Sequence, residues 1–168
     1  AHRMQALINE LLEYSRAGRV AQDLTTVDMK QVVDVVRSNL LSKIEECGAR
    51  IETYNLPSLT GDQRQLTQLL QNLVENGMKF RKKDTPPQID IEVEEKLDRW
   101  LFTVTDNGIG IEEKFKDRIF VIFQRLHTRD DYSGNGIGLA ICKKIVNRHG
   151  GDIWLDTDYE GGGRFRFT

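Results

Sequence analysis

The chain has 168 residues, of which 39% are hydrophobic and 30% are charged, and its net charge is −2 at neutral pH. This composition is typical of a soluble globular protein with one domain plus an appended element, and it excludes the disordered and fibrous classes. The slightly negative charge argues against nucleic acid as a main partner.

No apolar run approaches the roughly 20 residues that a membrane-spanning helix needs, and no secretory signal precedes the first predicted helix. We therefore expect a cytoplasmic location and no direct membrane contact. The two cysteines, Cys47 and Cys142, lie outside any CxxC spacing. Free thiols in a reducing compartment are expected rather than a zinc site or a disulfide.

The first predicted element is an amphipathic helix between His2 and Gly18, in which Met4, Leu7, Leu11 and Tyr14 recur at helical spacing. A single helix cannot bury such a stripe alone. It must therefore pack on the following domain or pair with other helices.

A second helix is predicted from about Met29 to Cys47, with Asp28 as its N-terminal cap and an apolar stripe facing the core. A short strand should follow over about residues 50–56. The third helix is predicted from about Asp62 to Phe80, where a row of leucines and Gly77 lie on one side. Gly77 would allow close packing.

The segment 89–106 alternates in the strand period on either side of a turn-prone LDR, so a hairpin is expected. Residues 106–138 are rich in glycine and charge and are predicted to form mainly a loop, with one short helix near 112–123. A loop of this length is usually functional. A helix that ends at Gly150 and a closing hairpin over 152–168 complete the chain.

Three polar residues of the third helix, Asn72, Asn76 and Lys79, fall along one edge of its apolar stripe and should border a cleft. Gln71 and Glu75 are expected to point toward solvent. Amide oxygens suit Mg²⁺, and a lysine can reach phosphate as a point charge. Asparagines on a helix edge are more often simply solvated, so this pattern alone leaves both interpretations open.

Two glycine-rich segments follow the hairpin. DNGIGI, which begins at Asp106, places a carboxylate acceptor beside flexible glycines, although DNG alone more often marks a turn. GNGIGLA at 134–140 places glycines before a helix, where N–H groups favour phosphate. Glu113 and Leu139 stand where GxGxxG needs its third glycine, and GxxxxGK[ST] is absent, so Rossmann and P-loop sites are excluded.

Four segments in order, QNLVENGMKF, DNGIGI, RIFVIFQRL and GNGIGLAICKKIVNRHGG, resemble the N, first glycine, F and second glycine boxes of sensor histidine kinases. The IFQRLHTR segment is similar to phytochrome-like sensor kinases in particular. The resemblance covers nearly the whole chain. It implies the Bergerat α+β two-layer sandwich of gyrase-type and chaperone ATPases, in which helices cover one face of a mixed β-sheet, here preceded by one N-terminal helix.

The resemblance implies a role for each matching residue at the base end of an ATP site. Asp106 would accept a hydrogen bond from the adenine amino group, Gly108 and Gly110 would shape that wall, and Phe80 would pack against the adenine.

At the phosphate end, the resemblance makes Asn76 the Mg²⁺ ligand, with Asn72 assisting around the metal and the phosphates. Lys79 would contact phosphate, and Arg125 would approach the γ-phosphate, so that Asn76, Lys79 and Arg125 form the implied catalytic set. The ATP lid would be lined by Gly134, Gly136 and Gly138, and Leu139 would start the helix behind it. Phe120 and Phe123 are either hydrophobic anchors for the lid or the dimerisation helices, or ordinary core aromatics.

The implied activity is that of a protein-histidine kinase, which passes the ATP γ-phosphate to a histidine for relay to a response-regulator aspartate. None of His2, His127 and His149 lies in an HExxxP-type context, so we expect Mg-ATP binding without autophosphorylation. The acceptor would lie on a hairpin of the same parent kinase, itself expected to be a homodimer. Residues 1–20 would be a remnant of that hairpin's second helix, and residues 21–168 the catalytic domain.

Two positions depart from the family pattern. Arg164 precedes the first Phe of the closing strand, where the family normally carries Ser or Thr beside the adenine-side waters. Asn135 stands in the lid where Thr is common.

Two other functions compete with this interpretation. An ATPase of the same fold needs a carboxylate one helical turn before the metal-binding Asn76, and the amide of Asn72 at that place cannot act as a base. The second competing function is that of a binding module. An anti-sigma-type kinase would not need the N-terminal helix, and a degenerate domain would not keep Asn76, Asp106 and the glycine boxes intact.

Overall fold

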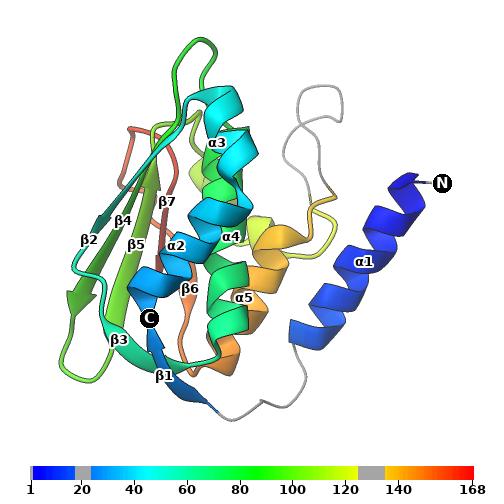
Figure 1. Cartoon of the computed structure of the whole chain (residues 1–168). Coiled ribbons are helices and arrows are strands. Elements are labelled where there is room, and N and C mark those ends of the chain that lie inside the picture. Colours follow the sequence, from blue (N-terminus) through cyan, green and yellow to red (C-terminus); the bar gives the residue numbers. More distant parts are fainter. Residues whose placement is uncertain (1, 18–23, 125–134) are drawn as a thin grey trace.

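The computed structural model describes residues 2–17, 24–124 and 135–168. Its helices form one layer over one face of a five-stranded sheet, and the N-terminal helix lies at the side of that layer (Figure 1). This arrangement is the expected α+β two-layer sandwich. The elements are α1 His2–Ala17, β1 Thr25–Asp28, α2 Met29–Asn39, α3 Leu41–Cys47, β2 Arg50–Tyr54, β3 Ser58–Gly61, α4 Gln63–Lys79, β4 Gln88–Glu95, β5 Trp100–Asp106, α5 Gly138–Arg148, β6 Ile153–Leu155 and β7 Arg164–Phe167.

The large sheet has the strand order β2-β4-β5-β7-β6, in which β2 and β4 are parallel and the other neighbours are antiparallel. Both predicted hairpins are therefore confirmed. Alternation along the strands turns one face toward the helices, as expected for a half-buried sheet. Asp106 lies on this core face, opposite Ile89 at the end of β5, so the strand delivers a carboxylate to the region beneath α4.

The predicted helix over 29–47 is wrong in one respect, because it is divided at Leu40. The backbone of Leu40 leaves the helical region, with φ −102° and ψ 5°, while its side chain is buried in the core. Asp28 caps α2 as predicted, because its carboxylate accepts a hydrogen bond from the N–H of Lys30 at 2.9 Å.

A small antiparallel sheet of β1 and β3 was not predicted from the sequence. Each strand has only four residues, which is too short for a clear alternation. The predicted strand over 50–56 ends at Tyr54, because Asn55 adopts a positive φ of 57°. β3 ends directly before Asp62, whose carboxylate caps α4 by accepting hydrogen bonds from the N–H groups of Arg64 and Gln65.

Helix α4 lies directly on the sheet. A Cβ added at Gly77 would be 2.9 Å from Ile89 Cγ1 and 3.2 Å from Asp106 Cβ, so the close packing expected at this glycine is present. The buried leucines of α4 anchor it, and truncating one of them to alanine typically costs about 2–5 kcal/mol. The consequence is that the C-terminal turn of α4 lies beside Asp106.

The expectation that Gln71 and Glu75 point to solvent is wrong. Gln71 accepts a hydrogen bond from Asn39 Nδ2 at 3.0 Å, and Glu75 forms an ion pair with Lys43 at 2.7 Å. Both side chains are half-buried, because α2 and α3 cover this side of α4 (Figure 1).

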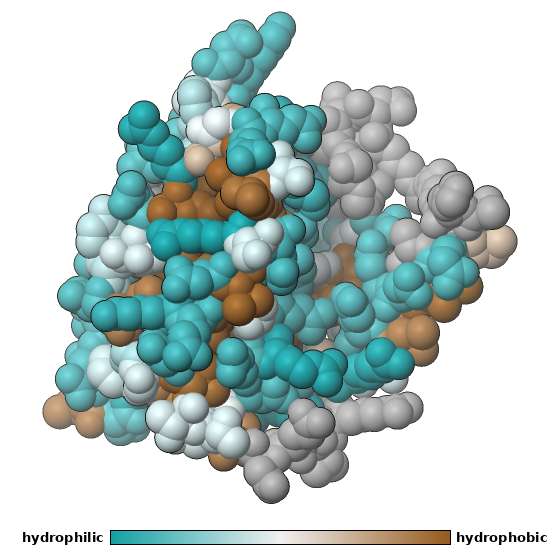
Figure 2. All heavy atoms as spheres, in the orientation of Figure 1, coloured by the Kyte–Doolittle hydropathy of each residue, from teal (hydrophilic) through white to brown (hydrophobic). Residues whose placement is uncertain are grey.

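Helix α1 packs on the domain through buried Ala17 and partly buried Tyr14 at its C-terminal end, and through polar contacts. Lys144 Nζ lies 3.9 Å from the Tyr14 ring centroid and donates to the Tyr14 carbonyl, and Gln68 donates to Glu13. Part of its apolar stripe remains exposed, and hydrophobic atoms also show between the polar side chains of the helical layer (Figure 2). The exposed apolar residues of α1 are Met4, Ile8, Leu11 and Leu12. Among the described residues, no helix is both long and apolar enough to cross a lipid bilayer.

Candidate functional site

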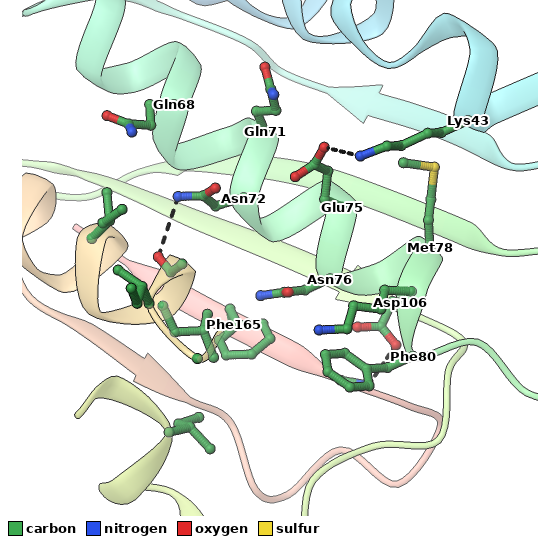
Figure 3. A pocket seen from close by; sticks show the side chains of 18 of the residues that line it. Lys43, Gln68, Gln71, Asn72, Glu75, Asn76, Met78, Phe80, Asp106 and Phe165 are labelled. Carbon is green, nitrogen blue, oxygen red and sulfur yellow. Dashed lines mark hydrogen bonds and ion pairs between the residues drawn. The ribbon is translucent and has the colours of Figure 1, made fainter. Parts of the chain in front are cut away.

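A cleft of about 1930 Å³ opens between α4, α5 and the loops at the end of β5, and it extends to α1. Figure 3 shows that Asn72, Asn76, Phe80 and Asp106 lie along one side of α4, together with Phe165 of β7. Glu75 instead turns toward Lys43. The structure therefore brings the predicted polar residues of α4 together with the carboxylate at the end of β5.

The carboxylate of Asp106 is fixed by backbone. Its Oδ1 accepts hydrogen bonds from the N–H groups of Gly108 at 2.8 Å and Gly163 at 3.0 Å. Burial raises the pKa of Asp106, while these two N–H groups and the nearby charge of Lys82 act in the opposite direction. Because both bonds use Oδ1, the carboxylate can still accept a hydrogen bond from a ligand through Oδ2.

Glycines make the wall around Asp106 possible. A Cβ at Gly108 would be 2.5 Å from the Phe80 carbonyl oxygen, and Gly110 has a positive φ of 74°. Gly162 was not predicted as a site residue, yet its Cβ would be 2.0 Å from the Asp106 carbonyl oxygen. Sequence reasoning also missed Gly163. The run GGG at 161–163 was the available signal, because it marks a place where backbone can approach backbone.

Phe80 and Lys79 follow Asn76 at the C-terminal end of α4. The Phe80 carbonyl accepts a hydrogen bond from the N–H of Ile109 at 2.9 Å, which ties α4 to the loop after β5. Lys79 Nζ lies 4.4 Å from the centroid of the Phe80 ring. Phe80 lies next to Asp106 in Figure 3, so an aromatic face adjoins the carboxylate.

Asn72 and Asn76 are half-buried and lie one helical turn apart on α4. Asn72 Nδ2 donates to the Gly138 carbonyl at 3.3 Å, so the amide nitrogen is used within the protein and Oδ1 is available to a ligand. Two amide oxygens from one helix face suit a Mg²⁺ ion, which takes few protein ligands and keeps several waters. This donor set fits the metal that the sequence implies.

The far end of the cleft is formed where α5 begins at Gly138. No side chain caps this helix at Ile137, so no side-chain acceptor satisfies its first N–H groups, and such groups favour an anion. Gly136 has a positive φ of 73°, and its carbonyl accepts a hydrogen bond from the N–H of Phe123 at 3.0 Å. Leu139 packs partly buried against the core. Arg125, His127 and Gly134 lie outside the described residues.

The short helix predicted near 112–123 is replaced by two 3-10 turns, Glu113–Phe115 and Arg118–Phe120. Phe120 is buried and packs edge-to-face on Phe165 at a centroid distance of 6.4 Å, so it is a core aromatic. Phe123 is 52% exposed and adopts a positive φ of 63°. A bulky residue in this conformation is strained.

Arg164, which departs from the family pattern, does not enter the cleft. Alternation along β7 places it on the opposite face of the sheet, where its Nε donates to Thr105 Oγ1 and its guanidinium lies 4.0 Å from the Tyr159 ring. His149 is also structural, since Nε2 accepts from the Asp62 N–H and Nδ1 donates to the Ile145 carbonyl.

Comparison with known proteins gives one consistent family. The family described as histidine kinase-, DNA gyrase B-, and HSP90-like ATPase matches residues 61–168. The chain is 49% identical to the phytochrome-like protein Cph1 of Synechocystis sp., over 98% of this chain and 22% of that protein. It is 36% identical to the adaptive-response sensory kinase SasA of Prochlorococcus marinus, over 87% of this chain and 39% of that protein. The chain thus spans about a fifth to two fifths of these relatives.

Solved structures agree with this result. Full-length ShkA in complex with AMPPNP has a TM-score of 0.79 at 26% identity, covering 98% of this chain and 35% of that chain. The catalytic domain of the histidine kinase ThkA has a TM-score of 0.71 at 28% identity, and the match covers 87% of this chain and 94% of that chain. ThkA in complex with the response regulator TrrA has a TM-score of 0.74 at 25% identity, and the match covers 99% of this chain and 46% of that chain.

Proposed function

Because the chain belongs to the histidine kinase-, DNA gyrase B-, and HSP90-like ATPase family, we propose that it is the ATP-binding catalytic domain of a sensor histidine kinase. It binds Mg-ATP in the cleft beside α4 and transfers the γ-phosphate to a histidine on an acceptor hairpin of the parent kinase. The observation that carries this proposal is the Asp106 carboxylate, which two backbone N–H groups fix at the end of the cleft that Asn72 and Asn76 also line.

At the base end, Asp106 accepts a hydrogen bond from the adenine amino group, and Phe80 packs against the ring. Gly108 and Gly110 leave room for the base to approach the backbone. A base with a carbonyl oxygen in place of the amino group cannot donate a hydrogen bond to the Asp106 carboxylate. Because two acceptors would then face each other, the site binds such a base weakly.

At the phosphate end, Asn76 is the Mg²⁺ ligand and Asn72 supports it. Mg²⁺ supplies positive charge that neutralises the phosphate oxygens. Lys79 contacts phosphate, the uncapped start of α5 attracts it, and Arg125 approaches the γ-phosphate. The chain therefore contributes positioning and charge, while the acceptor histidine contributes the nucleophile.

The acceptor is supplied in trans. His149 cannot serve, because both ring nitrogens are used in hydrogen bonds within the protein, and His2 and His127 do not lie in an acceptor sequence context. In this proposal residues 1–20 belong to the second helix of the acceptor hairpin, and residues 21–168 form the catalytic domain of a homodimeric parent.

The phosphate passes from the acceptor histidine to an aspartate of a response regulator. The complex of ThkA with its response regulator supports this partner class. We place the domain in the cytoplasm, since its substrate is ATP and both cysteines are free. The thiol of Cys142 is buried, and its burial raises the pKa to about 12, so it stays protonated and inert.

Hydrolysis of ATP by water is disfavoured. A same-fold ATPase would need a carboxylate at Asn72, one turn before Asn76, and an amide cannot act as a general base. Glu75, on the same helix, is held by Lys43 on the side of α4 that faces α3.

The first test is calorimetric titration of this chain with ADP and with a non-hydrolysable ATP analogue, with and without Mg²⁺. The acceptor-hairpin segment and labelled ATP are then added. We expect adenine-specific binding that Mg²⁺ strengthens, followed by transfer of the label to histidine. Label in free phosphate or on serine would contradict the kinase assignment while leaving the fold intact, and absence of nucleotide binding would contradict the site itself.

A further inference from the structure

The basic side chain of Lys82 lies just beyond the C-terminal end of α4, at the mouth of the base end of the cleft. Its Nζ donates to the Gly161 carbonyl at 3.3 Å. The positive charge of Lys82 lowers the pKa of Asp106, against the effect of burial. Lys82 thus joins the segment after α4 to the loop between β6 and β7, with Asp106 next to both.

The loop that Lys82 holds is the one that completes the wall around Asp106. Gly161 is followed by Gly162, which packs on the Asp106 backbone, and by Gly163, whose N–H binds Asp106 Oδ1. On its other side, the loop is held by Arg164, whose guanidinium lies on the Tyr159 ring. The Lys82 contact therefore adds a side-chain anchor to the backbone hydrogen bonds that Gly163 makes with Asp106.

We propose that Lys82 is a positioning and specificity-determining residue for the purine base: it holds the 161–163 backbone against Asp106, and its positive charge favours the carboxylate that accepts a hydrogen bond from an amino group. This inference rests on the proposed function, because it requires an adenine nucleotide in the cleft. Lys82 acts through Asp106 and need not touch the nucleotide.

The charges around Asp106 make the role of Lys82 specific. Burial favours the protonated carboxyl, and a protonated Oδ2 would offer a donor to the amino group of adenine. Among the neighbouring cations, Lys79 lies over the Phe80 ring, and Arg164 extends on the opposite face of the sheet. The charge of Lys82 lowers the pKa of Asp106 and so opposes the effect of burial.

The test compares Lys82→Met with the neighbouring exposed control Lys83→Met in the full chain. ADP and IDP are titrated by calorimetry across a range of pH, since the base of IDP carries a carbonyl oxygen in place of the amino group. Lys82→Met should weaken ADP binding about two- to fivefold at neutral pH, as expected for a partly screened charge pair, and should weaken IDP binding less, so that the preference for ADP over IDP falls. The pH at which ADP affinity is half lost should move upward.

Lys82→Arg should restore the wild-type pH profile, because it returns the positive charge, and Lys83→Met should match wild type. A Lys82→Met protein whose ADP to IDP preference and pH profile equal those of wild type overturns the inference. A purely structural role, in which affinity for both nucleotides falls with no movement along the pH axis, overturns it as well. Failure of wild type to bind ADP is a different outcome, because it contradicts the proposed function before Lys82 is tested.

Discussion

Asp106 combines a requirement of the site with a cost to the fold. Its carboxylate is buried, and the raised pKa means that the folded chain binds the proton more tightly than the unfolded chain does. The ionised carboxylate therefore lowers stability. This cost is absent below the ordinary pKa of aspartate, grows as pH rises toward the folded-state pKa, and stays constant above it.

Asp106→Asn should separate these two effects. The amide oxygen of asparagine can accept the N–H groups of Gly108 and Gly163, so the local backbone is kept. We expect the variant to be at least as stable as wild type at neutral pH in urea unfolding, and to lose that advantage in acid. Calorimetry should show ADP affinity reduced by at least about tenfold, as for loss of a charge-assisted hydrogen bond. A variant that still binds ADP tightly would contradict the role of Asp106.

The pH dependence of binding follows from the same carboxylate. As pH falls through the raised pKa of Asp106, its acceptor becomes a donor, and ADP affinity should fall. The measurement is ADP titration over a pH series with wild type and Asp106→Asn. Wild type should lose affinity toward acid, and the variant should lack this step. An identical acid step in both proteins would assign it to another group.

At the scale of elements, the sequence predicts what has a regular period. Helices α4 and α5 and both hairpins follow from apolar spacing. The sheet of β1 and β3 does not, because four-residue strands show no period, and neither does the break at Leu40, which depends on how its side chain is buried. For α4, the spacing correctly predicted that Asn72 and Asn76 lie on the same side of the helix. It could not predict that Glu75 pairs with Lys43, because this contact depends on how α3 packs on α4.

At the base end of the site, too, the sequence predicts local features but not contacts between distant segments. The strand end at Asp106 and its glycines can be recognised within a few residues of sequence. Gly162 and Gly163 belong to the site only because β5 and β7 are neighbours, which no local pattern states. Long-range backbone approach is therefore the part of the site that sequence reasoning missed.

Gly162→Ala tests this contact between elements. The new Cβ would lie 2.0 Å from the Asp106 carbonyl oxygen and 2.7 Å from the Gly108 nitrogen, and both atoms belong to backbone. We expect a loss of about 1–3 kcal/mol in urea unfolding from overpacking, together with at least about tenfold weaker ADP binding.

Gly48→Ala is the matched control, since Gly48 has a positive φ of 66° but nothing within 4 Å of the added Cβ. It should cost about 1 kcal/mol of stability through backbone strain alone and leave ADP affinity unchanged. If the two variants bind ADP equally well, the close approach at Gly162 is not needed for the site.

At the scale of the whole molecule, α1 is joined to the domain by polar and cationic contacts and, at its C-terminal end, by buried Ala17 and partly buried Tyr14. Asn135 Nδ2 donates to Glu10 at 3.0 Å, and Lys144 lies on Tyr14. The core of the domain is a continuous cluster built mainly from the sheet and the helices α2, α4 and α5, and Ala17 is the buried residue that α1 adds to it. The domain should therefore fold without α1.

Removal of residues 1–20 tests this division. Polar and cation–π contacts of these kinds contribute about 0.5–1 kcal/mol each, so the remaining 21–168 chain should lose about 1–3 kcal/mol of stability in urea. Its ADP affinity should stay within about threefold of that of the full chain, as measured by calorimetry. A truncated chain that does not fold cooperatively would show that α1 is integral to the domain.

The approach of residues 162–163 to Asp106 has a consequence for synthesis on the ribosome. The chain emerges N-terminal end first and can fold as it appears, so β4, β5 and α5 are available before β7. Until Arg164–Phe167 arrives, β5 presents an unpaired edge, which is a template for association with other chains. The base wall is incomplete over the same interval, so ATP cannot stabilise the nascent domain. Only a chain in which β7 has paired with β5 can therefore bind nucleotide. A chain whose synthesis stops before Gly162 would bind no nucleotide and would be prone to aggregate.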